Sequence, residues 1–92
     1  MERHHHKHES AKAVVNRISR AVGHLESIKR MVEEERDCSE ILVQLSAVRA
    51  AINGIGRVVL KDHIDHCVVD AAKRGDAAAL TRLNDAIATF LK

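Results

Sequence analysis

Apolar side chains return every three or four residues along almost the whole of this 92-residue chain, and no proline interrupts the pattern. That spacing is the period of an α-helix with one apolar face. It predicts an all-α protein with helices over about residues 10–36, 39–74 and 76–91. The apolar positions are Val14, Ile18, Ala21, Val22, Leu25, Ile28, Val32, Ile41, Leu45, Val48, Ile52, Ile55, Val59, Leu80, Leu83, Ile87 and Phe90.

Polar residues and glycines indicate where these helices begin and end. Asp37, followed three residues later by Glu40, resembles a capping box and predicts a tight turn near residues 36–38. Nothing stops the second helix before Gly75, which is suited to a C-terminal cap, so this helix should extend for roughly 54 Å. Asp76 is placed to cap the third helix.

Two glycines, Gly54 and Gly56, lie inside the second predicted helix, where each costs about 1 kcal/mol relative to alanine. The lysine and the strand-to-helix context of a phosphate-binding loop are missing. We interpret both glycines as positions where another helix approaches closely.

The predicted architecture is an antiparallel helical hairpin with a short third helix, in a single domain over residues 1–92. Residues 1–9 should form a flexible His-rich arm. One hairpin cannot bury the apolar stripes of two long helices, so a second copy is expected to cover them. An antiparallel homodimer that forms a four-helix bundle is the simplest solution, and it leaves the third helix free to promote higher assembly.

Positive charge is concentrated in parts of the chain, although the formal net charge is only +2. Residues 1–30 carry seven basic and three acidic side chains, and residues 41–61 carry Arg49, Arg57 and Lys61 with no acid. Such a basic face favours a polyanionic partner, and a solvated helix surface is the alternative.

No stretch approaches the roughly 18 apolar residues of a membrane span, and the N-terminus is charged where a signal peptide would be apolar. We therefore expect a cytoplasmic protein that does not bind membranes. Thiols stay reduced in the cytoplasm, so two cysteines favour metal or redox chemistry over a structural disulfide. Two inert core cysteines are the alternative.

His63 and Cys67 lie four residues apart on the second predicted helix, a spacing that can chelate a metal. Cys38 precedes His63 by a helical distance of about 37 Å, so one chain cannot bring them together. In an antiparallel dimer, however, the start of one second helix lies beside the end of its partner. We therefore predict a site between subunits, formed by Cys38 of one and by His63 and Cys67 of the other.

The His-rich arm should enter near this site, because the hairpin places residues 10–12 opposite residues 63–65. His6 is therefore a candidate fourth ligand. Two thiolates and one imidazole form a soft site that suits Cu(I), and Zn(II) fits if a fourth ligand joins. A further nitrogen, from His6 or from the backbone, would suit Ni(II) in a tetragonal geometry.

The segment from Val14 to Asp76 resembles the CsoR and RcnR repressors, a family that senses copper, nickel or cobalt and includes formaldehyde and persulfide sensors. Cys38, His63 and Cys67 have the order and spacing of its copper-sensing branch. The resemblance implies a dimer that assembles into a homotetramer, which binds double-stranded operator DNA in the apo state and releases it when the effector binds. It also implies DNA contacts from the first two helices, here by Lys12, Arg17, Arg20 and Arg49.

Two features depart from the copper-sensing branch. Residues 80–84 (LTRLN) lack the glutamate that in this branch helps to couple the metal-bound histidine to DNA release, and Asp37 stands where tyrosine is common. His6 matches an N-terminal histidine of the nickel-sensing members. We favour a Cu(I)-responsive repressor, with a Ni(II)- or Co(II)-responsive repressor that uses His6 as the alternative.

Other classes of function are less well supported. A thiol-based sensor would join Cys38 and Cys67 between subunits as a disulfide or polysulfide, and a metal-buffering module would leave the basic face without a DNA-binding role. An enzyme is not expected, because no nucleophile with a neighbouring base stands out and a single aromatic residue offers little to line a substrate pocket.

Overall fold

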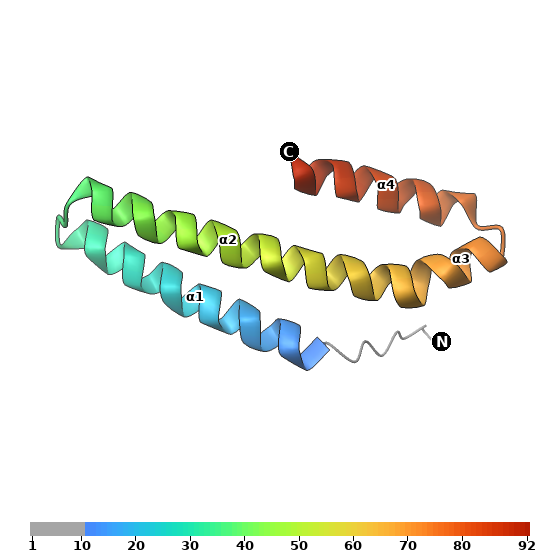
Figure 1. The fold of residues 1–92 in the computed structure, drawn as a ribbon, viewed down its shortest axis with the longest axis horizontal. Coiled ribbons are helices and arrows are strands. Elements are labelled where there is room, and N and C mark those ends of the chain that lie inside the picture. The colour runs from blue at the N-terminus through green and yellow to red at the C-terminus, as the bar shows by residue number, and fades with distance from the viewer. Residues whose placement is uncertain (1–10) are drawn as a thin grey trace.

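The computed structural model describes residues 11–92, except for the side chains of residues 66 and 67. Its elements are α1 (Ala11–Glu33), α2 (Cys38–His63), the π-helical turn η1 (Ile64–Val68), α3 (Val69–Lys73) and α4 (Ala77–Leu91) (Figure 1). No strand occurs within this part of the chain, and the predicted all-α fold is confirmed. The His-rich arm, including His6, lies outside the described residues.

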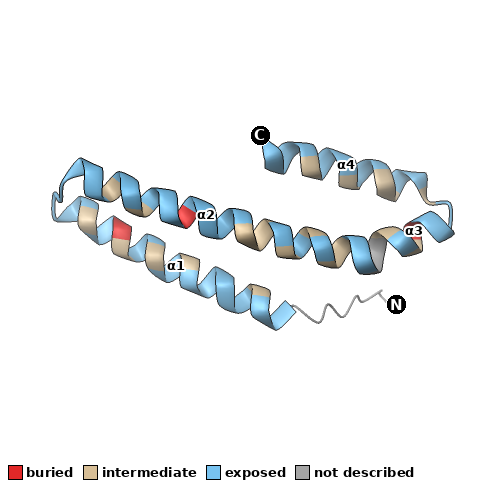
Figure 2. Ribbon diagram, in the orientation of Figure 1, coloured by how far each residue is buried: buried red, intermediate tan, exposed pale blue. Residues whose placement is uncertain are grey.

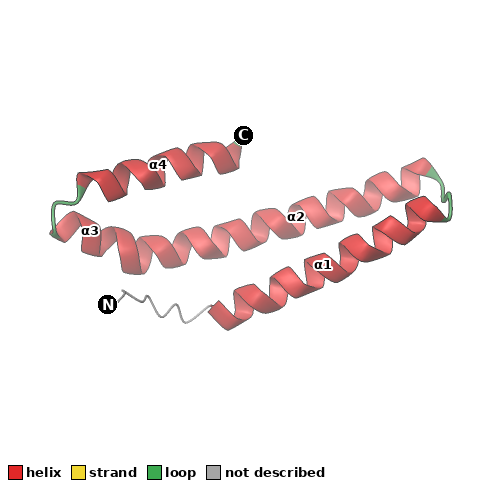
Figure 3. Cartoon of the chain, turned by 180° about the vertical axis from the view of Figure 1, so that it is seen from behind, coloured by secondary structure: helices red, strands yellow, loops and turns green. Residues whose placement is uncertain are grey.

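The long helix α2 lies between α1 and α4. α1 runs antiparallel to α2 along one side, and α4 returns along the other side, as the two opposite views in Figures 1 and 3 show. The molecule is elongated, with dimensions of 55 × 26 × 18 Å. The predicted helical hairpin with a short additional helix is therefore correct for the single chain.

The first helix ends earlier than predicted, at Glu33 instead of residue 36. The amide of Glu35 donates to the carbonyl of Val32 at 3.0 Å, and the amide of Arg36 donates to that of Met31 at 2.9 Å. These two bonds form a Schellman motif in which Glu35 adopts the left-handed conformation, with φ of 57°. Glycine usually occupies this position, and its absence left the helix end without its usual sequence signal.

Asp37 caps the N-terminus of α2, as predicted. Its carboxylate accepts hydrogen bonds from the hydroxyl and from the backbone N–H of Ser39, the latter at 3.1 Å. These bonds hold the pKa of Asp37 below its ordinary value. Glu40, the second residue of the predicted capping box, pairs with Arg36 at 2.8 Å.

The turn before α4 follows the sequence prediction. Gly75 has φ of 69°, and its amide donates to the carbonyl of Ala72 at 3.1 Å, while the amide of Asp76 donates to that of Ala71 at 2.9 Å. This is again a Schellman motif, here with glycine at the left-handed position. The carboxylate of Asp76 accepts a hydrogen bond from the amide of Ala79 at 3.1 Å and so caps α4.

The second helix is not a continuous α-helix to residue 74, because residues 64–68 form a π-helical turn. His63 and, further along the chain, Val68 and Ala71 line the groove beside α4. A π-turn uses i to i+5 hydrogen bonds. The sequence shows no break here, because Leu60, Ile64, Val68 and Ala71 continue the three- and four-residue spacing of an α-helix.

Only Ile28, Val48 and Ala71 are buried among the described residues (Figure 2). The apolar stripe of α1 is largely uncovered, and Val22 exposes 54% of its surface. One polar contact also joins the hairpin, between His24 Nε2 and Gln44 Oε1 at 2.6 Å. The single chain thus leaves most of its predicted core in contact with solvent. Within the described residues, no helix is both long and apolar enough to span a membrane.

The two helix glycines have different neighbours. The ring of Phe90 from α4 lies against Gly56, and a Cβ at this position would overlap it, which confirms the predicted close approach. A Cβ on Gly54 would lie 3.7 Å from Arg17 Nη1 and 3.7 Å from Arg57 Nη2, which is ordinary van der Waals separation. The prediction of close helix packing is therefore correct for Gly56 but not for Gly54.

Candidate metal centre and nucleic-acid face

The predicted ligands Cys38 and His63 are the first and last residues of α2. Asp37 caps this helix directly before Cys38, whose side chain is exposed as a free thiol. A helix of this length places the two residues about 37 Å apart. The structure therefore keeps Cys38 and His63 of one chain apart, as the residue count predicts.

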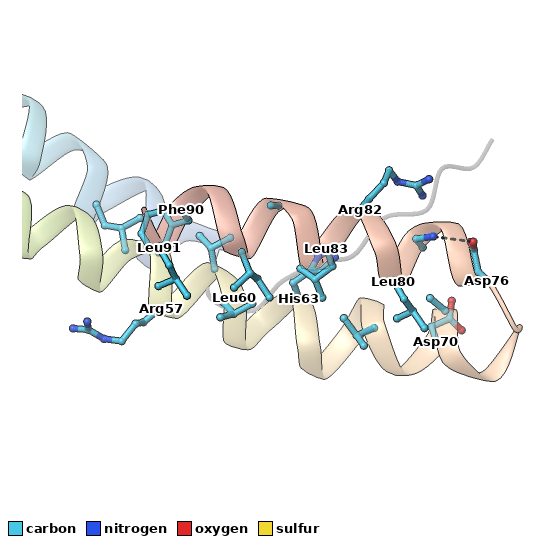
Figure 4. Close-up of a pocket in the computed structure, with 18 of the residues that line it drawn as sticks. Arg57, Leu60, His63, Asp70, Asp76, Leu80, Arg82, Leu83, Phe90 and Leu91 are labelled. Carbon is cyan, nitrogen blue, oxygen red and sulfur yellow. Dashed lines mark hydrogen bonds between the residues drawn. The ribbon is translucent and has the colours of Figure 1, made fainter.

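His63 is half-buried in a groove between α2 and α4, with a volume of about 1100 Å³ (Figure 4). Leu60 on its own helix and Leu83 on α4 lie beside it. Within the described residues, the imidazole forms no hydrogen bond or ion pair with another side chain.

The wall that α4 presents to this groove is apolar except for Arg82 and contains no carboxylate. Its residues are Ala79, Leu80, Arg82, Leu83, Ala86, Ile87, Phe90 and Leu91. The sequence lacks the glutamate of the copper-sensing branch at residues 80–84, and in the structure α4 accordingly presents no carboxylate to His63. No carboxylate from α4 within this chain can accept a hydrogen bond from the imidazole.

Cys67 follows His63 by four residues and lies in η1, about one helical turn further along the chain. Its side chain and all of His6 lie outside what the structure describes. Among the described side chains, no group of three or more His, Cys, Asp or Glu residues is arranged to hold a metal ion.

The basic residues proposed for DNA binding, Lys12, Arg17 and Arg20 of α1 and Arg49 of α2, are all exposed. Arg17 and Arg20 also line a small hollow of about 140 Å³ between the two helices, and the remaining lining residues are Ala21, His24, Ala51 and Ile55.

Arg57, which sequence reasoning placed in the basic stretch but did not single out, extends over Gly54 toward Arg17. The sequence could indicate Arg57 as a DNA-binding candidate only by its place in a segment without acidic residues. The proximity of Arg57 to Arg17 of α1 depends on how the two helices of the hairpin pack.

The all-helical hairpin and the spacing of Cys38, His63 and Cys67 agree with a known class of regulator. The chain belongs to the family of metal-sensitive transcriptional repressors, whose family model matches residues 10–90. It is therefore a metal-sensing transcriptional repressor and not an enzyme, and the resemblance to the CsoR and RcnR repressors is confirmed.

The similar proteins include copper sensors and a nickel sensor. The copper-sensing transcriptional repressor CsoR of Bacillus subtilis (strain 168) is 43% identical over 100 aligned positions, covering 100% of this chain and 99% of the relative. The Cu(I)-bound copper-sensing repressor CsoR of Geobacillus thermodenitrificans superposes with a TM-score of 0.83 at 35% identity, covering 100% of this chain and 95% of that chain. The nickel-responsive transcriptional regulator InrS superposes with a TM-score of 0.74 at 41% identity, covering 95% of this chain and 99% of that chain.

Proposed function

We propose that this protein represses transcription by binding operator DNA in its apo form and releases the DNA when Cu(I) binds. The ligands are Cys38 of one subunit and His63 and Cys67 of the other. The observation that carries the proposal is the placement of Cys38 and His63 at opposite ends of one continuous α-helix. An antiparallel partner brings the two ends together twice, once at each end of the dimer.

The donor set suits Cu(I). Two thiolates and one imidazole are soft ligands, and Cu(I) accepts three of them. The exposed thiol of Cys38 is accessible, and the imidazole of His63 lines the open groove between α2 and α4. The copper-sensing relatives, at 43% and 35% identity over the whole chain, support this metal.

The exposed apolar stripe of α1 supports a homodimer, because a second hairpin would cover it. We propose that dimers pair further into a homotetramer. Lys12, Arg17, Arg20 and Arg49 then contact phosphates of double-stranded operator DNA.

A Ni(II)- or Co(II)-responsive repressor is the second candidate. Two observations favour it: the similarity to the nickel-responsive InrS, and the absence of a carboxylate where α4 faces His63. In this version, His6 adds a nitrogen to the two thiolates and one imidazole, which suits a tetragonal Ni(II) site. Zn(II) also fits if a fourth ligand joins.

The test is a titration of the fully reduced protein, bound to DNA selected by the apo protein from a random pool, with Cu(I), Ni(II), Co(II) and Zn(II). We expect stoichiometric Cu(I) to release the DNA, as followed by fluorescence anisotropy. His6→Ala should change the affinity for Cu(I) by no more than a few-fold but lower the affinity for Ni(II) at least tenfold, about 1.4 kcal/mol. His63→Ala should lower the affinity for both metals.

Release by Ni(II) alone, and its loss in His6→Ala, would replace copper with nickel as the effector. Release by none of the metals, with DNA binding intact, would contradict the metal-responsive proposal.

A further inference from the structure

Two arginines from different helices converge over Gly54. Arg17 Nη1 from α1 and Arg57 Nη2 from α2 each lie 3.7 Å from the position that a Cβ on Gly54 would occupy. The two nitrogens are therefore separated by no more than twice that distance. Both side chains are exposed, so this convergence is not a consequence of burial.

No carboxylate compensates these charges within the described part of the chain. The ion pairs there involve Arg36, Lys61 and Arg74, and none includes Arg17, Arg20 or Arg57. Arg20 adds a further positive charge at the neighbouring hollow between α1 and α2. Like charges held this close repel each other, and an anion between them removes that repulsion.

We propose that Arg17, Arg57 and Gly54 form one binding site for a single backbone phosphate of DNA, called here the shared phosphate site. This inference rests on the proposed DNA-binding function and adds Arg57 and Gly54 to it. A guanidinium group matches the geometry of phosphate oxygens, and two such groups from different helices can grip one phosphate from two sides.

Gly54 has a direct role in this site. A Cβ would meet both guanidinium groups at ordinary van der Waals distance, so alanine fits the free protein without displacing either arginine. It would, however, fill the space between them that a phosphate oxygen requires. Glycine is the residue that allows such a close approach of a ligand to the backbone.

The experiment measures affinity for the selected DNA, and its salt dependence, for wild type, Arg17→Ala, Arg57→Ala and the double variant. Each single change should weaken binding at least fivefold. The double variant should lose clearly less than the product of the two single losses, because both arginines serve one phosphate. In the double variant, the slope of log affinity against log salt concentration should become about one unit shallower than in wild type, since one phosphate contact is lost.

Two further variants separate the site from general effects. Gly54→Ala should weaken DNA binding at least fivefold without lowering the melting temperature, and Arg57→Lys should recover part of the affinity lost in Arg57→Ala. Arg82→Ala on α4, which removes the same charge elsewhere, should bind within twofold of wild type. Circular dichroism and metal affinity should be unchanged in all of these variants.

The shared phosphate site would be overturned if the double variant lost affinity by the product of the two single losses and its salt slope fell by two units. Each arginine would then contact its own phosphate. An Arg57→Ala or Gly54→Ala variant that binds within twofold of wild type would also overturn it. If Arg17→Ala still weakens binding in that case, the proposed function stands and only this inference fails. A wild-type protein that selects no DNA would contradict both.

Discussion

Glu35 carries a backbone conformation that its residue type does not favour. It is the only non-glycine residue with positive φ among the described residues, and it ends α1 in the position that Gly75 occupies at the end of α3. A left-handed conformation costs an L-residue about 1–2 kcal/mol, whereas glycine adopts it without steric conflict but loses more chain entropy on folding. The two Schellman turns are therefore alike in hydrogen bonding and different in strain.

We expect Glu35→Gly to stabilise the fold by about 0.5–1 kcal/mol, because the strain removed exceeds the extra entropy lost. The midpoint and slope of urea unfolding measure this change. Glu34→Gly is the matched control: its amide donates to Arg30 in the last helical turn at 2.9 Å, so glycine there should destabilise by up to about 1 kcal/mol. A loss of stability in Glu35→Gly equal to that of the control would refute this account of the turn.

At the scale of the elements, the contact between α2 and α4 depends on Gly56. Phe90 lies where a Cβ at position 56 would be, so the absence of a side chain lets the two helices approach. The ring is 49% exposed and close to the C-terminus, so it can move away at modest cost. The substitution Gly56→Ala should therefore raise the helix propensity of α2 but weaken the packing of α4 against it.

A double-mutant cycle separates these two effects. Gly56→Ala should gain little or no stability in the wild-type background, but about 1 kcal/mol when Phe90→Ala has already removed the ring. Hydrogen exchange of α4 amides should accelerate in Gly56→Ala alone. Gly23→Ala, where nothing lies within 4 Å, is the control and should show no dependence on Phe90. Equal effects of Gly56→Ala in both backgrounds would mean that α4 does not pack on this glycine.

At the scale of the whole molecule, one chain has too little core to be self-sufficient. Within the described part of the chain, three buried residues along a body 55 Å long leave the apolar stripe of α1 in water. Small helical domains gain stability by sharing such faces. The same antiparallel pairing that would cover the stripe would also join Cys38 to His63 and Cys67, so assembly and metal binding should depend on each other.

This coupling predicts complementation between inactive subunits. Cys38→Ala alone and the double variant His63→Ala/Cys67→Ala alone should each bind Cu(I) weakly, because every site lacks at least one ligand. Mixing them after unfolding and refolding should restore one complete site per mixed dimer, as measured by competition with a Cu(I) chelator. No recovery in a verified mixed dimer, or full affinity in a monomeric preparation, would exclude ligands shared between subunits.

The sequence by itself determined the helices, three of their caps and the separation of Cys38 from His63, because helical periodicity, capping and rise per residue are local properties. Only the tertiary structure decided the π-turn at residues 64–68 and the convergence of Arg57 on Arg17. The apolar spacing of Leu60, Ile64, Val68 and Ala71 is that of an ordinary α-helix, so no local pattern indicates the π-turn. The arginines meet because the hairpin sets the register of α1 on α2, and such a register depends on contacts between residues far apart in the chain.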